Sequence, residues 1–218
     1  MPLYFGVFVS LFAYLIGMEL KKKFGWPVLN PLLVAIILVI AFLKATGITY
    51  TDYNEGASYI SYFLTPATVC LAIPLYKQLE LLKRNLTAVA TAITAGVIGS
   101  VVSVYKLEHV HYVSLLPKSI TTAIGMGVSE EAGGIVTMTI VSIIITGILG
   151  NIVADGWFEL IGIKEPIAKG LALGTSAHAI GTAKALELGE VEGAMSSLSI
   201  AVAGLMTVVS VPIMSGLI

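Results

Sequence analysis

The residues best suited to chemistry lie within two apolar stretches of the sequence. One cluster surrounds the only histidine inside an apolar run and consists of Gly174, Thr175, Ser176, His178, Gly181, Thr182 and Lys184. The other follows a proline and consists of Lys118, Ser119, Thr121 and Thr122. Polar and ionisable groups in apolar surroundings are costly, so they normally face a cavity or a partner. We therefore take both clusters as candidate substrate-binding residues.

The chemistry predicted for these clusters is the binding of a small carboxylate. Pro117 is tolerated at the first position of a helix, where free N–H groups form the positive end of the helix dipole. Such N–H groups, with neighbouring hydroxyls and the Lys118 cation, suit an anion. The imidazole of His178 titrates near neutral pH, which suits it to carry a coupling proton or to pair with the anion.

A structural interpretation of the same residues stays open. Lys118 can extend its ammonium to the membrane interface, and the hydroxyls beside it can bond to their own helix. The Gly, Ser and Thr residues around His178 can also mediate close helix packing without any transport role. Lys184 and Glu187 are three residues apart, which predicts an ion pair on one helix face.

The composition indicates that lipid is the solvent for most of the chain. Hydrophobic residues make up 57% of the 218 residues and charged residues only 11%. Soluble domains are about 25% charged, and a single small domain cannot shield this much apolar surface from water. Disordered chains are poor in apolar residues, so disorder is excluded as well. The net charge of −1 provides no field to attract nucleic acid.

The apolar stretches are long enough to cross a bilayer as helices. A spanning helix needs about 20 mostly apolar residues, and the period-two alternation of a barrel strand is absent. We predict an all-α, polytopic transmembrane bundle that forms one domain over residues 1–218. The eight expected spans are residues 3–20, 28–46, 58–76, 86–105, 115–130, 135–153, 166–186 and 195–217. Polar loops are expected at residues 21–25, 47–57, 77–85, 106–114 and 154–165.

Three segments carry polar interruptions that contain Gly or Pro, whereas spans such as 135–153 and 195–217 are plainly apolar. The interrupted segments are 58–76, 115–134 and 166–193. Interrupted helices break and free backbone groups at membrane depth. The first of these segments contributes candidate cavity-lining residues, namely Thr65, Pro66 and Thr68.

A comparison of the chain with itself indicates an internal repeat. A shift of 57 residues aligns the pairs Ser119 and Ser176, Glu130 and Glu187, Ser142 and Ser199, Ile143 and Ile200, and Gly147 and Gly204. Paired interrupted segments in corresponding halves point to the binding site of a transporter. The sequence leaves open whether the two copies are parallel or inverted.

Basic residues set the expected orientation in the cell membrane. The run 21–23 lies in the first loop, and Lys77, Lys83 and Arg84 lie in the third. Basic loops stay in the cytoplasm, which places the N-terminus outside. Zinc, nucleophile-elbow and phosphate-loop motifs are absent from the sequence, so we expect neither an enzyme nor a bound metal or cofactor.

Three motifs resemble the LrgB family, which also includes CidB and the C-terminal half of the plastid glycolate/glycerate translocator. They are Pro-Ala-Thr-Val-Cys-Leu-Ala-Ile-Pro-Leu-Tyr-Lys at 66–77, Leu-Pro-Lys-Ser-Ile-Thr-Thr at 116–122, and the long block 170–193 with Gly-Thr-Ala-Lys-Ala-Leu-Glu-Leu-Gly-Glu-Val-Glu-Gly at 181–193. Departures from the family pattern are Ala123 in place of Pro, Lys184 in place of Arg, and the order Ser176-Ala177. A lysine keeps the charge of an arginine but lacks its planar fork.

The resemblance implies one of two functions. The first is transport of a small 2-oxo or 2-hydroxy monocarboxylate such as pyruvate, glycolate or glycerate. The second is antiholin-like control of murein hydrolase export and cell lysis without transport. Either function implies a small LrgA-like membrane protein as partner, and a homo-oligomer is a further expected assembly. We favour transport, because interrupted polar helices account for it directly.

Overall fold

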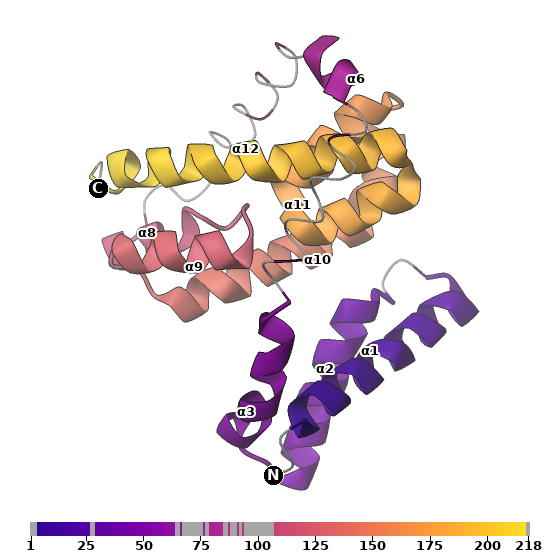
Figure 1. The fold of residues 1–218 in the computed structure, drawn as a ribbon, viewed down its shortest axis with the longest axis vertical. Helices are drawn as coiled ribbons and strands as arrows, with labels where there is room; N and C mark the ends of the chain where they lie inside the picture. Colours follow the sequence, from indigo (N-terminus) through magenta and orange to yellow (C-terminus); the bar gives the residue numbers. More distant parts are fainter. Residues whose placement is uncertain are drawn as a thin grey trace. The chain divides into compact units, whose positions relative to one another are not determined.

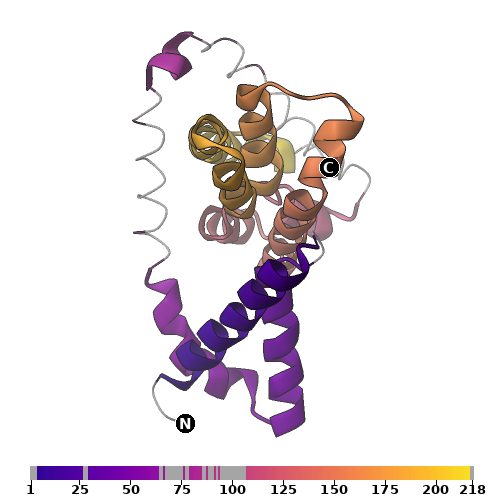
Figure 2. The ribbon, with the colours of Figure 1, turned by 90° about the vertical axis from the view of Figure 1, so that its right-hand side faces the viewer.

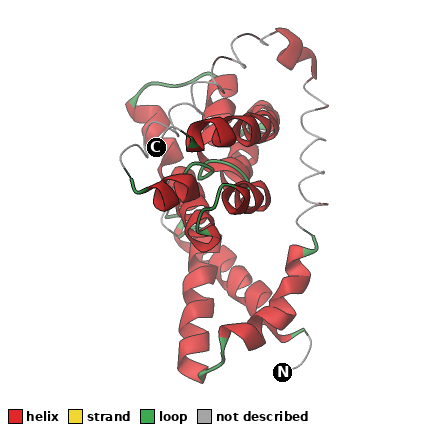
Figure 3. Ribbon diagram, turned by 90° about the vertical axis from the view of Figure 1, so that its left-hand side faces the viewer, coloured by secondary structure: helices red, strands yellow, loops and turns green. Residues whose placement is uncertain are grey.

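The structure, a computed structural model, describes residues 4–26, 29–63, 79–84 and 107–216 and the single positions 66, 76, 87, 91 and 93. Within these residues every regular element is a helix and none is a strand (Figure 3). This confirms the predicted all-α class. The chain divides into two compact units, Met1–Cys70 and Leu71–Ile218 (Figure 1).

Local sequence signals set the ends of the helices in the first unit, which are α1 (Phe5–Phe24), α2 (Pro31–Thr46) and α3 (Tyr50–Ser61). α1 ends at Gly25, whose φ of 67° is the left-handed conformation that favours glycine. α2 follows Asn30, whose Oδ1 accepts a hydrogen bond from the backbone N–H of Leu32 at 2.9 Å. At the start of α3, the Thr49 hydroxyl accepts from the backbone N–H of Asp52 at 3.2 Å.

Glycines let the backbones of the first unit approach closely. A Cβ atom on Gly17 of α1 would lie 2.6 Å from the carbonyl oxygen of Pro31 in α2. A Cβ atom on Gly6 would collide with the backbone of Tyr53 in α3. One turn further along α1, the Ser10 hydroxyl lies 2.6 Å from the Tyr53 hydroxyl. Small residues and hydroxyl pairs at helix contacts are typical of membrane proteins.

Several helix boundaries differ from the sequence-based expectation. α1 continues to Phe24 in the first predicted loop, α6 (Leu79–Arg84) lies in the predicted 77–85 loop, and α8 (His109–Leu115) occupies most of the predicted 106–114 loop. α3 occupies most of the predicted 47–57 loop, because its Thr49 cap and the Asp52 side chain in the first turn favour a helix start despite the polar composition. α10 (Val136–Leu160) extends past residue 153, because charged side chains do not end a helix; Gly162, with φ 73°, lies just past its end. α12 (Glu190–Ser215) begins before residue 195, with two acids in its first turn.

The second unit contains the longest apolar helices of the described residues. Besides α10 and α12 it includes α6 (Leu79–Arg84), α8 (His109–Leu115), α9 (Thr122–Glu131) and α11 (Pro166–Leu188) (Figure 2). Among the described residues, α10 and α12 are long and apolar enough to cross a membrane, and α2 is a shorter apolar helix. The predicted span 86–105 and most of 58–76 fall outside the described residues.

The helix boundaries of the second unit follow the predicted repeat. Shifting α8 by 57 residues gives 166–172, which begins where α11 begins. Shifting α9 gives 179–188, which starts directly after the non-helical residue His178 and ends where α11 ends. α10 shifts to 193–217, close to the bounds of α12. Each copy is therefore a broken helix followed by a long helix.

The two copies of the repeat run in opposite directions. α10 packs against α8 near its start, through Ser114, and against α11 near its end, through Asp155. α12 contacts α11 near its start, through Ser196, and α8 at its end, through Met214. The long helices therefore lie antiparallel between the same two neighbours (Figure 1). This arrangement makes the repeat an inverted one.

A substitution at Gly17 tests the close contact between α1 and α2. Gly17→Ala should lower the free energy of unfolding by about 1–3 kcal/mol, because the new methyl group meets backbone that cannot move aside. Gly156→Ala in α10 has open space around the new atom and should be neutral or stabilising by about 0.5–1 kcal/mol. Denaturant unfolding of the purified protein in detergent measures both, and equal effects would contradict the described contact.

Candidate functional site

The first helix break separates α8 from α9, within the predicted interrupted segment 115–134. The expectation that a helix starts at Pro117 is wrong, because Pro117 lies in the turns between the two helices and Thr121 is the N-cap of the second. α8 ends at Leu115, residues 116–120 form turns, and α9 begins at Thr122. Pro117 and Ile120 are buried within this break, and Ile120 packs with Leu171 of α11 and Met195 of α12. The break therefore lies against the second copy of the repeat.

The predicted site residues of the first break differ in exposure. Lys118, Ser119 and Thr122 are half-buried, whereas Thr121 is buried at the N-cap of α9. The Thr121 side chain makes no capping hydrogen bond. The N-terminal turn of α9 thus begins next to a half-buried cation.

A buried hydroxyl cluster holds the first break against α10. The hydroxyl of Thr139 lies 2.7 Å from the backbone carbonyl oxygen of Ser114 and 2.7 Å from the hydroxyl of Ser129. All three residues are fully buried. Ser196, which takes the place of Thr139 in the second copy, pairs in the same way with the hydroxyl of Thr182 at 2.7 Å. Each long helix is therefore fixed by a hydroxyl pair to the half-helix before it.

The second helix break lies at His178, within α11. Its backbone has φ 42° and ψ −131°, the one positive φ at a non-glycine position among the described residues. Such a conformation costs a side-chain-bearing residue about 1–3 kcal/mol and persists only where its surroundings enforce it. The predicted break in this segment is therefore confirmed, and it is centred on the histidine.

The imidazole of His178 is fixed by α10. Only 2% of the residue is exposed, and Nε2 lies 2.8 Å from the carbonyl oxygen of Ile143. A carbonyl can only accept, so Nε2 carries the proton. Nδ1 is buried and makes no hydrogen bond to any described residue. The ring is therefore anchored on one side and has an unused polar atom on the other.

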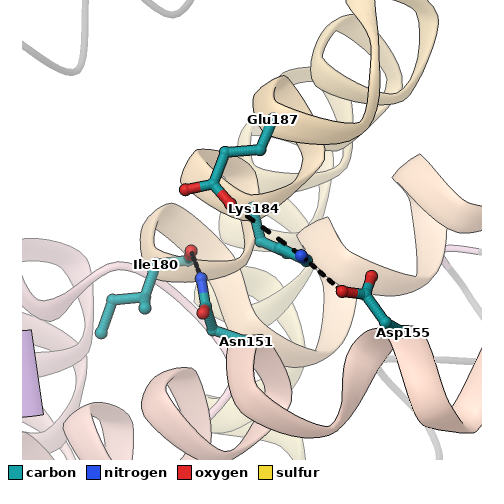
Figure 4. A network of polar contacts seen from close by, with 5 residues as sticks. All are labelled: Asn151, Asp155, Ile180, Lys184 and Glu187. Atoms are coloured by element: carbon teal, nitrogen blue, oxygen red, sulfur yellow. Dashed lines mark hydrogen bonds and ion pairs between the residues drawn. The ribbon is translucent and has the colours of Figure 1, made fainter. Parts of the chain in front are cut away.

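One face of α10 supports the second half of α11. It consists of residues spaced four apart, namely Ile143, Gly147, Asn151 and Asp155. A Cβ atom on Gly147 would lie 2.8 Å from the His178 ring, so only glycine leaves room for it. The Asn151 side-chain N–H donates to the carbonyl oxygen of Ile180 at 3.1 Å, a backbone group just past the break (Figure 4).

The same face ends in an ion pair. Nζ of Lys184 lies 2.6 Å from Oδ2 of Asp155 and 3.9 Å from Oε2 of Glu187 (Figure 4). The contact with Glu187 is the pair that the spacing predicts, but the shorter contact with Asp155 comes from another helix. Lys184 thus belongs to the α10–α11 contact.

Ile143 connects the two breaks. Its carbonyl oxygen accepts from His178, and its side chain packs against Gly125 of α9, where a Cβ atom would lie 2.5 Å from Cδ1. Gly204, the counterpart of Gly147 in the other copy, packs in turn against Ile124 of α9. Each long helix therefore contacts the broken helix of the opposite copy.

The remaining residues of the predicted cluster are used in helix packing. The hydroxyls of Thr175 and Ser176 donate to the carbonyl oxygens of Leu171 and Ala172 in their own helix. Gly174 lies so close to α12 that a Cβ atom would collide with the Ser196 backbone, and Gly181 lies equally close to the Leu173 carbonyl. Of the candidate cavity-lining residues, Thr65 and Thr68 fall outside the described residues and Pro66 is exposed.

Sequence reasoning missed the α10 face, because the span at 135–153 is mostly apolar. Two polar residues four apart near its end, Asn151 and Asp155, are the signal that indicates this face. Gly147 and Ile143 carry no such signal, since one contributes only space and the other a backbone carbonyl. The described residues contain no cluster of three or more His, Cys, Asp or Glu able to hold a metal ion.

Comparison with known proteins identifies the family. The LrgB-like family matches residues 10–217. The chain belongs to the LrgB-like family. Two relatives named antiholin-like protein LrgB are each 44% identical to it: one from Bacillus mycoides (strain KBAB4), over 96% of this chain and 94% of the relative, and one from Bacillus subtilis (strain 168), over 99% and 96%. The Bacillus cereus (strain B4264) protein of the same name is 43% identical.

No solved structure matches the chain. The family assignment and the apolar helices α10 and α12 make this LrgB-like chain a helical membrane protein.

Two substitutions at His178 test the strain at the break. Both remove the ring, but only glycine adopts φ 42° without steric cost. We expect His178→Gly to be more stable than His178→Ala by about 1–3 kcal/mol, measured by unfolding in detergent.

The same pair of substitutions at Ser176, two residues earlier, serves as the control. Glycine in an ordinary helix interior is less stable than alanine by about 0.5–1 kcal/mol, so Ser176→Gly should be the weaker variant there. The same order of stability at both positions would show that the His178 backbone is not strained.

Proposed function

We propose that this LrgB-like chain is a multi-pass carrier of a small 2-oxo or 2-hydroxy monocarboxylate. The observation that supports it is a pair of helix breaks at equivalent positions of an inverted repeat, before Thr122 and at His178. Inverted repeats with broken helices are typical of secondary transporters, which bind their substrates at the breaks.

The breaks have the polarity that a carboxylate requires. Each one places the N-terminus of a half-helix inside its unit, α9 in one copy and residues 179–188 in the other. The backbone N–H groups at the N-terminal end of a helix carry partial positive charge. Lys118 adds a cation beside the first half-helix, and Lys184 lies on the second. Relative movement of the two copies would then expose the bound anion to each side in turn.

The carrier we propose works in the cell membrane with partners. Its N-terminus lies outside, because we place the basic segments 21–23 and 77–84 in the cytoplasm. A small LrgA-like membrane protein is its expected partner, and copies of the chain assemble into a homo-oligomer. The substrate class, pyruvate, glycolate or glycerate, comes from the family resemblance together with the donors at the breaks.

A second candidate function is antiholin-like control of murein hydrolase export and cell lysis, without transport. The names of the Bacillus relatives favour it. The contact between α11 and α12 is also closely packed at Gly170 and Gly174, and the Thr175 and Ser176 hydroxyls bond to their own helix. A scaffold that regulates a pore would use these residues only as helix contacts.

Uptake into proteoliposomes tests the carrier. Vesicles that hold the protein and an LrgA-like partner should accumulate labelled pyruvate or glycolate, whereas empty vesicles should not. His178→Ala should slow uptake about tenfold or more, a loss that corresponds to only about 1.4 kcal/mol of interaction. Glu159→Gln, at an exposed position of α10, should leave uptake unchanged.

The contrary results separate the two candidates. Absence of uptake by the unaltered protein with its partner would contradict the carrier and leave lysis control, which an autolysis assay on cells with and without the protein measures. If the unaltered protein takes up substrate and His178→Ala takes it up at the same rate, the placement of the substrate site at His178 would be contradicted instead.

A further inference from the structure

The ion pair between α10 and α11 joins a mostly buried side chain to a half-exposed one. Nζ of Lys184 lies 2.6 Å from Oδ2 of Asp155. The lysine side chain is 15% exposed, whereas the aspartate side chain is 53% exposed. The ammonium is thus mostly buried, and it meets the half-exposed carboxylate between α10 and α11 (Figure 4).

Other contacts already hold the two helices together. The Nε2–H of His178 donates to Ile143 and the Asn151 amide donates to Ile180, both between α10 and α11. Gly147 and Gly150 of α10 add close packing against the same helix. An ion pair with one well-exposed partner contributes only about 0–1 kcal/mol to stability. The Asp155 carboxylate is therefore able to leave Lys184 without separating the helices.

Asp155 pairs with Lys184 through a carboxylate, the same chemical group that a monocarboxylate substrate would present to this lysine. An ammonium group has three N–H donors and pairs with one carboxylate as readily as with another. The second nearby carboxylate, Glu187, lies at 3.9 Å, beyond hydrogen-bond distance. The other charged residues of α10, α11 and α12 make no described ion pair with Lys184: they are Lys169 near the start of α11, Glu159 near the end of α10, and Glu190 and Glu192 in the first turn of α12.

We propose that Lys184 is an anion site for the small monocarboxylate and that Asp155 occupies this site in place of the substrate. This inference rests on the proposed carrier function. Binding of the substrate carboxylate displaces Asp155, so the contact between α10 and α11 changes with occupancy. Asp155 sets the affinity by competition, because a ligand binds only the fraction of molecules in which the lysine is available.

Removal of the competing carboxylate tests this role. If Asp155 occupies Lys184 about nine-tenths of the time, Asp155→Asn and Asp155→Ala should each lower the apparent KM for glycolate or pyruvate uptake about tenfold. Lys184→Gln should raise the apparent KM instead. Glu159→Gln removes a carboxylate from the next turn of α10 and is the matched control, with an unchanged KM.

A second measurement does not depend on transport. Glycolate should raise the melting temperature of the detergent-purified Asp155→Asn protein at lower concentration than it does for the unaltered protein. The neutral analogue glycolamide should stabilise neither, because it lacks the charge that pairs with Lys184.

The outcomes distinguish this inference from the function on which it rests. The role of Asp155 would be overturned if the unaltered protein takes up substrate and both Asp155 variants show the same apparent KM and the same stabilisation by glycolate as the unaltered protein. The carrier function would then still stand. Absence of uptake together with absence of glycolate stabilisation in every variant would overturn both.

Discussion

Backbone groups that a helix break releases must find partners within the protein, and the second unit is organised around this requirement. At His178, Asn151 of α10 donates to the carbonyl oxygen of Ile180, and Thr182 of α11 itself donates to the carbonyl oxygen of His178. The histidine ring is pinned to the Ile143 carbonyl, which stabilises a backbone conformation that costs free energy. α10 therefore stabilises the broken helix α11 through these contacts.

Because the repeat is inverted, the broken helix of each copy is packed against the long helix of the other. Each long helix contacts the broken helix of the other copy, through Gly147 in one case and Gly204 in the other. The copies are not chemically identical, because Thr121 occupies the place of His178 and Gly127 that of Lys184. The donors for an anion are thus divided between the copies, with Lys118 at one break and Lys184 near the other.

The sequence predicted the helical class, both interrupted segments and the repeat. Apolar runs long enough to span a bilayer can satisfy their backbone groups only as helices, and Gly, Pro and hydroxyl residues within them indicate where a helix is interrupted. It did not predict the direction of the repeat, since residue identities at a fixed spacing are the same for parallel and inverted copies. Nor did it predict the contacts of Ile143 and Gly147. Ile143 contributes a backbone carbonyl, which every residue has, and Gly147 contributes only the absence of a side chain. Helix ends at 50, 160 and 190 were misplaced because polarity, rather than capping, was taken as the boundary.

Accessibility of the breaks to water-borne reagents tests the central claim most directly. Single cysteines at Thr121 and Ala179, with Cys70 replaced by alanine, would be treated with a charged, membrane-impermeant thiol reagent in sealed vesicles. A cysteine at Ile145, an apolar position of α10 that is 51% exposed, is the control that we expect to face lipid. The account predicts that both break positions react and that glycolate protects them, while position 145 stays unlabelled. Break positions as unreactive as 145 would contradict it.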